Sequence, residues 1–300
     1  MSMAPLVLSG HLKDLGGGFT VRRLLPAVQC KSVGPFLFFD HFGPVTVQPT
    51  DEYDVRPHPH IGLATVTYLF DGAIMHRDNL GSVQEITPGA INWMTAGHGI
   101  VHSERRPERL QNVQYVNHGI QLWVALPQAH EATTPSFVHT PASDIPEVNL
   151  AGAVVRVLVG SAFGQISPVA TLAPTLYLEL RLEPGAQLEL PALADEMAIY
   201  TVDAALQVDG QTVAVQTLAV LEPGQPVQLT SPEGGRYMVL GGASQGYRHI
   251  WWNFVASDNT LIDDAAARWG RMDAATGMGQ VQGETEFIPV PDRPARKPGA

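Results

Sequence analysis

The chain has very little cysteine and few charged residues. Cys30 is the only cysteine among 300 residues, so neither an intramolecular disulfide nor a cysteine metal cage can form. No apolar run approaches the ~20 residues needed to cross a bilayer, and residues 1–18 lack the basic start and long apolar core of a signal peptide. We therefore expect a cytoplasmic protein without membrane contact.

Basic residues are scarcer than acidic ones. Eighteen lysines and arginines against 29 aspartates and glutamates give a formal net charge of −11. Such a surface repels phosphate backbones, so we expect no direct binding of nucleic acid. The chain is instead rich in apolar residues (45%), with 29 glycines and 24 prolines, which indicates a compact all-β protein with many tight turns.

Short runs of β-branched and aromatic residues recur between glycine and proline turns and predict strands. The clearest are residues 19–25, 62–69, 90–94, 120–126, 154–159, 176–182 and 237–240. One amphipathic helix is predicted from Asn259 to Trp269. Its expected features are a cap at Ser257 or Asp258, an end at Gly270, and one apolar face formed by Leu261, Ala265 and Trp269.

Turn dipeptides recur at a nearly constant spacing. Asp71-Gly72 and Asp209-Gly210, both typical of hairpins, lie 138 positions apart, and Pro88-Gly89 and Pro223-Gly224 lie 135 apart. Such a repeat predicts two similar β-domains. We place them at residues 1–130 and 131–300, the second including the helix and the C-terminal tail.

Two short pairs, His58-Pro59-His60 and His102-Ser103-Glu104, carry the strongest chemical signal. Residues i and i+2 of a strand face the same side, so each pair can aim two side chains at one point. A single HxH pair is more often two surface or hydrogen-bonded histidines, but two pairs in one β-rich region favour a metal site. Three imidazoles and one carboxylate suit a divalent first-row metal, so we predict His58, His60, His102 and Glu104 as ligands.

The second half keeps the repeat but not the ligands. The two offsets project the four ligand positions onto residues that cannot form such a set: Glu196, Ala198, Tyr237 and Val239. We therefore expect the chemistry in the first domain only.

A Pro-Gly turn before a strand, with HxH earlier and a lone histidine later, is the layout of a cupin barrel, and longer segments resemble the pirin family. These are residues 56–62 (RPHPHIG), 65–68, 76–78, 92–97, 99–104 and 118–124, with 34–36 and 39–41. The resemblance is dense over 18–127 and thinner beyond. It implies an all-β bicupin of two antiparallel, jelly-roll-like β-barrels, with one metal ion in the N-terminal barrel on His58, His60, His102 and Glu104.

The resemblance also implies a function. Some pirins resemble quercetin 2,3-dioxygenases, so we expect an Fe(II) enzyme that opens a flavonol-type ring with O2, with Glu104 as catalytic base and a small aromatic substrate. Manganese, nickel, copper or zinc are alternative metals. The alternative function is an iron-dependent redox sensor that binds a protein partner, as described for eukaryotic members; a metal-stabilised relic without turnover is a third.

Three further histidines lie near this pattern. His76 and His118 are expected either to orient the metal ligands or to be ordinary barrel histidines. His98, between Gly97 and Gly99, is either at the mouth of the site or an exposed loop residue. The apolar side chains near the ligands are expected first as barrel core: Phe36, Phe38, Trp93, Met94, Leu122 and Trp123. Because closed barrels leave few free sheet edges, we expect a monomer.

Overall fold

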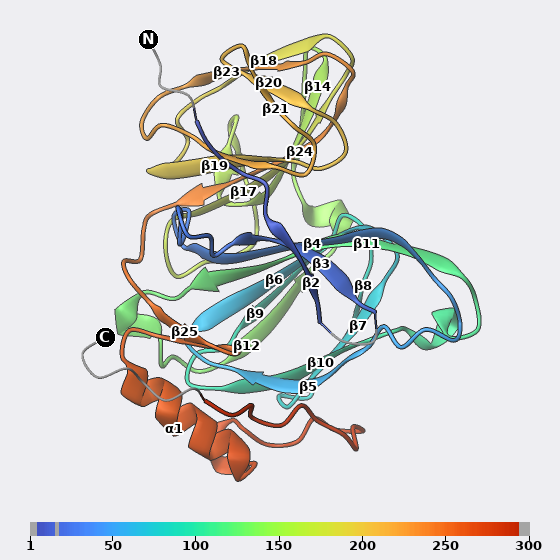
Figure 1. Cartoon of the computed structure of the whole chain (residues 1–300), viewed down its shortest axis with the longest axis vertical. Coiled ribbons are helices and arrows are strands. Elements are labelled where there is room, and N and C mark those ends of the chain that lie inside the picture. The colour runs from blue at the N-terminus through green and yellow to red at the C-terminus, as the bar shows by residue number, and fades with distance from the viewer. Residues whose placement is uncertain (1–4, 16–17, 294–300) are drawn as a thin grey trace.

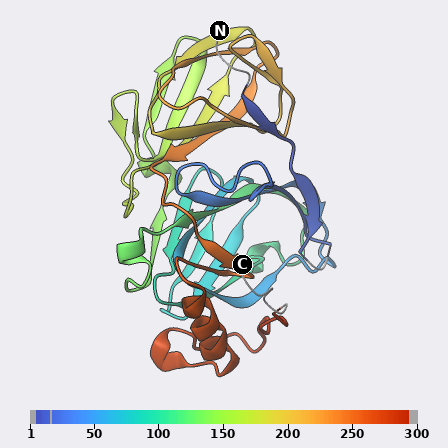
Figure 2. The same cartoon turned by 60° about the vertical axis from the view of Figure 1, so that its left-hand side comes forward.

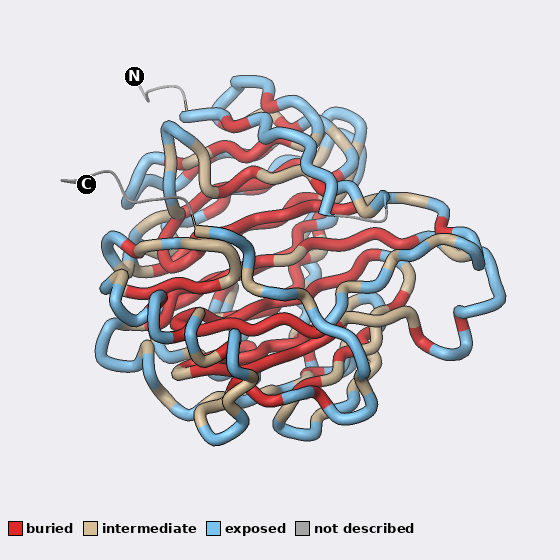
Figure 3. Tube along the Cα trace, turned by 60° about the horizontal axis from the view of Figure 1, so that its bottom comes forward, coloured by how far each residue is buried: buried red, intermediate tan, exposed pale blue. Residues whose placement is uncertain are grey.

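The computed structural model describes residues 5–15 and 18–293. The chain forms two stacked β-domains, and the helix α1 (Asn259–Gly270) lies at the far end of the N-terminal one (Figure 1). Buried residues follow the strands of both domains, and exposed residues gather in the connecting turns (Figure 3).

The N-terminal domain is built from two antiparallel sheets. The larger has the order β12 (Ser136–Thr140), β9 (Ile91–Thr95), β6 (Leu63–Asp71), β11 (Tyr115–Ala125), β4 (Phe36–Val47), β3 (Thr20–Leu25) and β2 (His11–Asp14). The smaller has the order β5 (Val55–His60), β10 (Ile100–Arg105), β7 (Ile74–Asp78) and β8 (Val83–Ile86).

The C-terminal domain repeats this arrangement. Its larger sheet has the order β1 (Leu6–Leu8), β22 (Leu218–Val220), β19 (Glu196–Thr201), β24 (Gly235–Gly242), β17 (Thr175–Leu182), β14 (Ala153–Val159) and β13 (Glu147–Leu150). Its smaller sheet has the order β18 (Ala186–Leu190), β23 (Val227–Ser231), β20 (Leu206–Val208) and β21 (Gln211–Val213). Each domain is thus a two-sheet jelly roll with open edges, so the expected two-domain β-fold is confirmed but the barrels are not closed.

Short elements complete the chain. They are the two-stranded sheets β15 (Ser161–Ala162) with β16 (Gln165–Ile166) and β25 (His249–Trp251) with β26 (Phe254–Ala256), and the 3₁₀ turns Glu108–Leu110, Gln128–His130, Ala142–Asp144 and Ala274–Thr276. The predicted boundary at residue 130 falls at the end of the second of these turns.

Each end of the chain packs on the other domain. β1 pairs with β22 of the C-terminal sheet, whereas Phe254 of β26 forms a bridge to Ile61 of the N-terminal domain. Figure 2 shows the C-terminal segment leaving the upper domain and running down the lower one to α1. Between the domains lies one shared apolar core, in which Phe39 and Tyr200 have ring centroids 4.7 Å apart.

All seven predicted strands are present, and the helix begins at Asn259 as expected. Asp258 is its N-cap, with the side chain accepting a hydrogen bond from Thr260 N. The predicted apolar face was wrong at one position, because Ile262 is buried and Leu261 is 39% exposed. Gly270 is the last helical residue.

The turn assignments were half right. Asp209-Gly210 joins the paired strands β20 and β21 as a two-residue hairpin, with positive φ at both residues. Asp71-Gly72 instead leads from β6 in the large sheet to β7 in the small one, so it is not a hairpin.

The repeat is real, but its register differs from the one that the turns predicted. The order β5-β10-β7-β8 corresponds to β18-β23-β20-β21, and the pair His58↔His102 corresponds to Leu188↔Leu229. Counted from the matching strand ends (His60 with Leu190, Ile100 with Val227), the four predicted ligands correspond to Leu188, Leu190, Leu229 and Ser231, all of them buried. The C-terminal domain fills with leucine the space in which the N-terminal domain gathers histidines.

Candidate metal centre

Two neighbouring strands bring three histidines together. In the antiparallel pair β5–β10, His102 lies directly opposite His58, and His60 is two residues further along β5 on the same face. The ring centroids are 4.4 Å apart for His58–His102, 5.0 Å for His58–His60 and 5.1 Å for His60–His102. Within the described ranges, these three form the group of potential ligands whose ligating atoms all lie within 4.8 Å of one another.

Backbone carbonyls set the tautomers of the first two histidines. His58 Nδ1 lies 2.9 Å from the carbonyl oxygen of Arg56, and His60 Nδ1 lies 3.0 Å from that of Asn253. A carbonyl only accepts, so each Nδ1 carries the proton and each Nε2 keeps its lone pair. Both rings are thereby prepared to ligate a metal through Nε2.

His102 is oriented by a chain of two further side chains. The Asp78 carboxylate accepts a hydrogen bond from His76 Nε2 at 3.0 Å. Burial raises the pKa of Asp78, but the hydrogen bonds from His76 and Ser82 outweigh it, so the pKa is lowered overall and the carboxylate stays ionised. His76 Nδ1 is then an acceptor, 3.4 Å from His102 Nδ1. This assignment leaves the lone pair on His102 Nε2, a buried atom without a hydrogen-bond partner among the described residues.

Burial keeps the three imidazoles neutral. Desolvation lowers the pKa of His58 to about 4 and holds those of His60 and His102 well below the usual value. A metal ligand must be the neutral imidazole, so these rings fit a divalent cation at neutral pH without first losing a proton.

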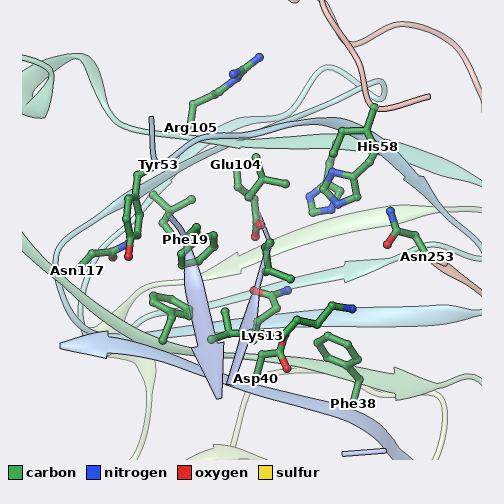
Figure 4. A pocket seen from close by; sticks show the side chains of 18 of the residues that line it. Lys13, Phe19, Phe38, Asp40, Tyr53, His58, Glu104, Arg105, Asn117 and Asn253 are labelled. Carbon is green, nitrogen blue, oxygen red and sulfur yellow. The ribbon is translucent and has the colours of Figure 1, made fainter. Parts of the chain in front are cut away.

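The histidines line a cavity of about 400 Å³. Glu104 lies outside the group of three close ligands but lines the same cavity, and Figure 4 shows its carboxylate pointing into the space that the His58 ring also faces. Its strand neighbour Ser103 faces the other way, toward Glu284. Burial raises the pKa of Glu104 to about 7.

An aromatic stack forms one wall of the cavity. Trp123 meets His60 edge to face with centroids 5.3 Å apart, and Phe38 stacks on Trp123 at 4.1 Å and 12°. The Arg23 guanidinium covers Phe38 at 4.2 Å and is held by Asp40 through contacts of 2.8 and 2.7 Å. All six apolar candidates lie in the cores, as expected, and two of them, Phe38 and Trp123, also line the cavity.

The remaining predicted histidines lie elsewhere. His98 borders a separate cavity beside α1, together with Arg268 and Gly97. His118 faces the domain interface, where its Nε2 is 2.8 Å from His41 Nε2. Of the three secondary candidates, only His76 contacts a histidine of the site.

The C-terminal segment also contributes to the site, which the sequence alone did not indicate. Trp252, Asn253 and Ile288 all line the metal cavity, and the Asn253 carbonyl orients His60. The Glu284 carboxylate accepts hydrogen bonds from Ser103 and Arg105 on the outer face of β10. No short motif marks these residues, because their position depends on a fold-back over roughly two hundred residues of chain.

Two jelly rolls with one three-histidine cluster in the first define the class of protein as a bicupin with a candidate metal centre. The family profile described as Pirin matches residues 18–124, and the pirin C-terminal cupin domain matches residues 177–274. Together the two matches cover more than half of the chain, which therefore belongs to the pirin family.

Individual proteins agree with this assignment. A pirin-like protein of Caulobacter vibrioides is 43% identical over 298 residues, covering 97% of this chain and all of that protein. The crystal structure of a quercetin 2,3-dioxygenase from Acinetobacter baumannii superposes with a TM-score of 0.90 at 32% identity, covering 98% of this chain and 97% of the other. The Escherichia coli pirin YhhW in complex with nickel(II) shares the fold, with a TM-score of 0.63 at 15% identity over 80% of this chain and 99% of that one.

Along the described part of the chain, no helix is long and apolar enough to span a bilayer.

Proposed function

We propose that this protein is a metal-dependent dioxygenase that opens a flavonol-type aromatic enol with O2, using Fe(II) bound to His58, His60 and His102. The observation that carries the proposal is the convergence of three neutral imidazoles, each with a free Nε2, on a cavity of about 400 Å³. Three protein ligands leave coordination positions open, the arrangement of a catalytic rather than a structural site.

A redox-active divalent metal would supply Lewis acidity toward an enol oxygen and reactivity with dioxygen. Neutral histidines leave the positive charge of such a cation uncompensated, so the site favours an anionic, enolate-like oxygen. Glu104, with a pKa of about 7, takes the enol proton, because a base is most effective when its pKa lies near the working pH. Under the same proposal, Glu104 would be able to hold the metal as a fourth, carboxylate ligand when it is not carrying the proton.

The cavity suits a flat aromatic substrate. A volume of about 400 Å³ lies within the range of small-molecule sites. Phe38 and Trp123 offer aromatic edges near the histidines, and Lys13, Asp40 and Gln121 supply polar groups for further hydroxyls. Lys13 and Asp40 lie side by side in Figure 4.

Two relatives support the proposal. The Acinetobacter protein that superposes over almost the whole chain is named a quercetin 2,3-dioxygenase, and the nickel(II) complex of YhhW shows that this fold holds a first-row metal. Iron is our proposed metal, and imidazole ligands also accept manganese, nickel, copper or zinc.

The test is oxygen uptake by anaerobically iron-loaded protein mixed with quercetin, with His58→Ala/His60→Ala as the control. We expect uptake, and loss of the flavonol absorbance, only in the wild type. Iron bound without uptake would contradict the dioxygenase and favour the redox-sensing alternative with a protein partner.

A further inference from the structure

The tip of the β25–β26 hairpin contains a strained residue. Trp252 has φ +54°, a left-handed conformation that glycine adopts freely and that is costly for a bulky side chain. Trp251 and Phe254 are paired across the hairpin, so Trp252 and Asn253 form its two-residue turn. The first turn position of such a hairpin, when its φ is positive, normally calls for glycine, and tryptophan there requires compensation elsewhere.

The surroundings hold this strained turn firmly against the metal cavity. Phe254 is fully buried and forms a bridge to Ile61, one residue beyond the HxH pair. Val255 N donates to Ile61 O at 3.2 Å, and its carbonyl oxygen lies so close to Gly62 that a Cβ there would be 1.9 Å away. The hairpin is therefore anchored on the strand that carries His58 and His60.

The two tip residues both face the site. The Asn253 carbonyl fixes the His60 tautomer, and Figure 4 shows Asn253 near His58. Trp252 lines the same cavity and is only partly buried, so its side chain is in contact with both the cavity and solvent. An edge-to-face contact with Phe254, with centroids 5.3 Å apart, holds the ring in place.

We propose that Trp252 is a specificity-determining residue that limits the size of ligand reaching the metal site. Backbone strain retained in the wall of a ligand cavity is a recognised sign of a functional constraint, and here the strained residue carries tryptophan, the largest of the standard side chains. We call the Trp252 side chain the gate: it admits flat, unsubstituted aromatic enols to the metal site and excludes those with a bulky substituent beside the chelating oxygens. This inference rests on the proposed metal site but needs no turnover.

The experiment compares how tightly a small and a large ligand bind to the metal. Cobalt(II)-loaded wild type, Trp252→Gly and Trp251→Ala are titrated with imidazole and with 4-phenylimidazole, following the cobalt absorption bands. Trp251 is the matched control, because it neighbours Trp252 but does not line the cavity. We expect the wild type and Trp251→Ala to prefer imidazole equally, and Trp252→Gly to reduce that preference by roughly ten-fold.

A stability measurement separates the effect of the Trp252 side chain on ligand size from the effect of its backbone strain on folding. Trp252→Gly accepts the positive φ and Trp252→Ala does not, so the glycine variant is expected to unfold at the higher temperature while both lose the size preference. An unchanged preference in folded, cobalt-loaded Trp252→Gly would overturn the proposal. Failure of the wild type to bind cobalt would overturn it as well, since no metal would then lie behind the gate. Absence of quercetin turnover, by contrast, contradicts only the dioxygenase.

Discussion

At the scale of single residues, the site is defined by where each imidazole places its proton. The carbonyls of Arg56 and Asn253 and the Asp78–His76 pair all act on an Nδ1 atom. Because every Nδ1 is occupied, every Nε2 is free, and the three free atoms converge. These hydrogen bonds preorganise the three histidines as ligands, which reduces the free-energy cost of binding a metal ion.

His76 is the residue by which this preparation can be tested. We predict that His76→Phe, which keeps an aromatic ring to stack on Phe137, lowers metal affinity by about 10- to 100-fold, because His102 Nδ1 loses its acceptor. Calorimetric titration with nickel(II) or cobalt(II) measures the effect. His118→Gln removes a histidine at the domain interface and should leave the affinity unchanged; equal losses in both variants would contradict the orienting chain.

Glu104 tests the chemistry rather than the binding. We predict that Glu104→Gln still binds metal through the three histidines but turns over a flavonol about 10²- to 10⁴-fold more slowly, because the amide cannot accept the enol proton. Steady-state flavonol consumption at confirmed metal content is the measurement. Wild-type turnover by the variant would remove Glu104 from the mechanism.

The sequence could predict the cluster of His58, His60 and His102 but not the groups that orient these rings. The spacing of His58-Pro59-His60 is local, and alternation along a strand is enough to interpret it. His76 and His118 could not be told apart, because the difference depends on which strand lies beside each: β7 borders β10 in the small sheet, whereas His118 on β11 faces the C-terminal domain.

At the scale of elements, β10 shows how one strand serves two purposes. Its inward residues His102 and Glu104 face the cavity, and its outward residues Ser103 and Arg105 hold the C-terminal segment through Glu284. Docking of residues 281–290 is therefore coupled to the strand that carries a predicted ligand.

Glu284 is the clearest test of that coupling. It accepts hydrogen bonds from Ser103 at 2.7 Å and from Arg105 at 2.5 and 3.2 Å, so we predict that Glu284→Ala lowers the free energy of unfolding by about 2 kcal/mol. Glu286→Ala is the control, because that side chain is 51% exposed and such pairs contribute less than about 1 kcal/mol. Chemical denaturation compares them, and equal effects would contradict the account.

The repeat shows where sequence patterns mislead about elements. An Asp-Gly dipeptide indicates positive φ equally well in a hairpin and in a crossover between sheets. Matching Asp71-Gly72 to Asp209-Gly210 therefore aligned the two domains in the wrong register. The conclusion that the second domain lacks the ligands nevertheless holds, because Leu188, Leu190 and Leu229 occupy the equivalent positions.

At the scale of the whole molecule, a buried hydrogen-bonded chain joins the two domains. The Tyr200 hydroxyl of the C-terminal domain lies 2.7 Å from His41 Nδ1, and His41 Nε2 lies 2.8 Å from His118 Nε2. Burial, with the charges of His118 and Arg22, lowers the pKa of His41 to about 3. The folded protein therefore holds His41 neutral.

This chain makes stability depend on pH. The unfolded state binds a proton at His41 near pH 6.5 and the folded state only near pH 3, so stability falls as the pH falls through this window. His41→Gln keeps hydrogen-bonding capacity but does not titrate. We predict that between pH 7 and pH 5 its free energy of unfolding falls by about 2 kcal/mol less than that of the wild type. Urea unfolding at the two pH values is the measurement, and parallel pH profiles would contradict it.

The open jelly rolls have sheet edges that a closed barrel would lack. A monomer was expected because closed barrels have few edges, but β12 and β2 border the large N-terminal sheet and β5 and β8 the small one. The fold class was predictable from turn spacing and the family resemblance, whereas the closure of the sheets was not, since it depends on how distant strands meet.

The most direct test of the central claim is a metal titration of the intact protein. We predict one tightly bound divalent first-row ion per chain in the wild type, and none of comparable affinity in His58→Ala/His60→Ala, with both proteins equally folded by circular dichroism. Equal metal binding by the two proteins, or none by the wild type, would contradict the assignment of His58, His60 and His102 as a metal centre.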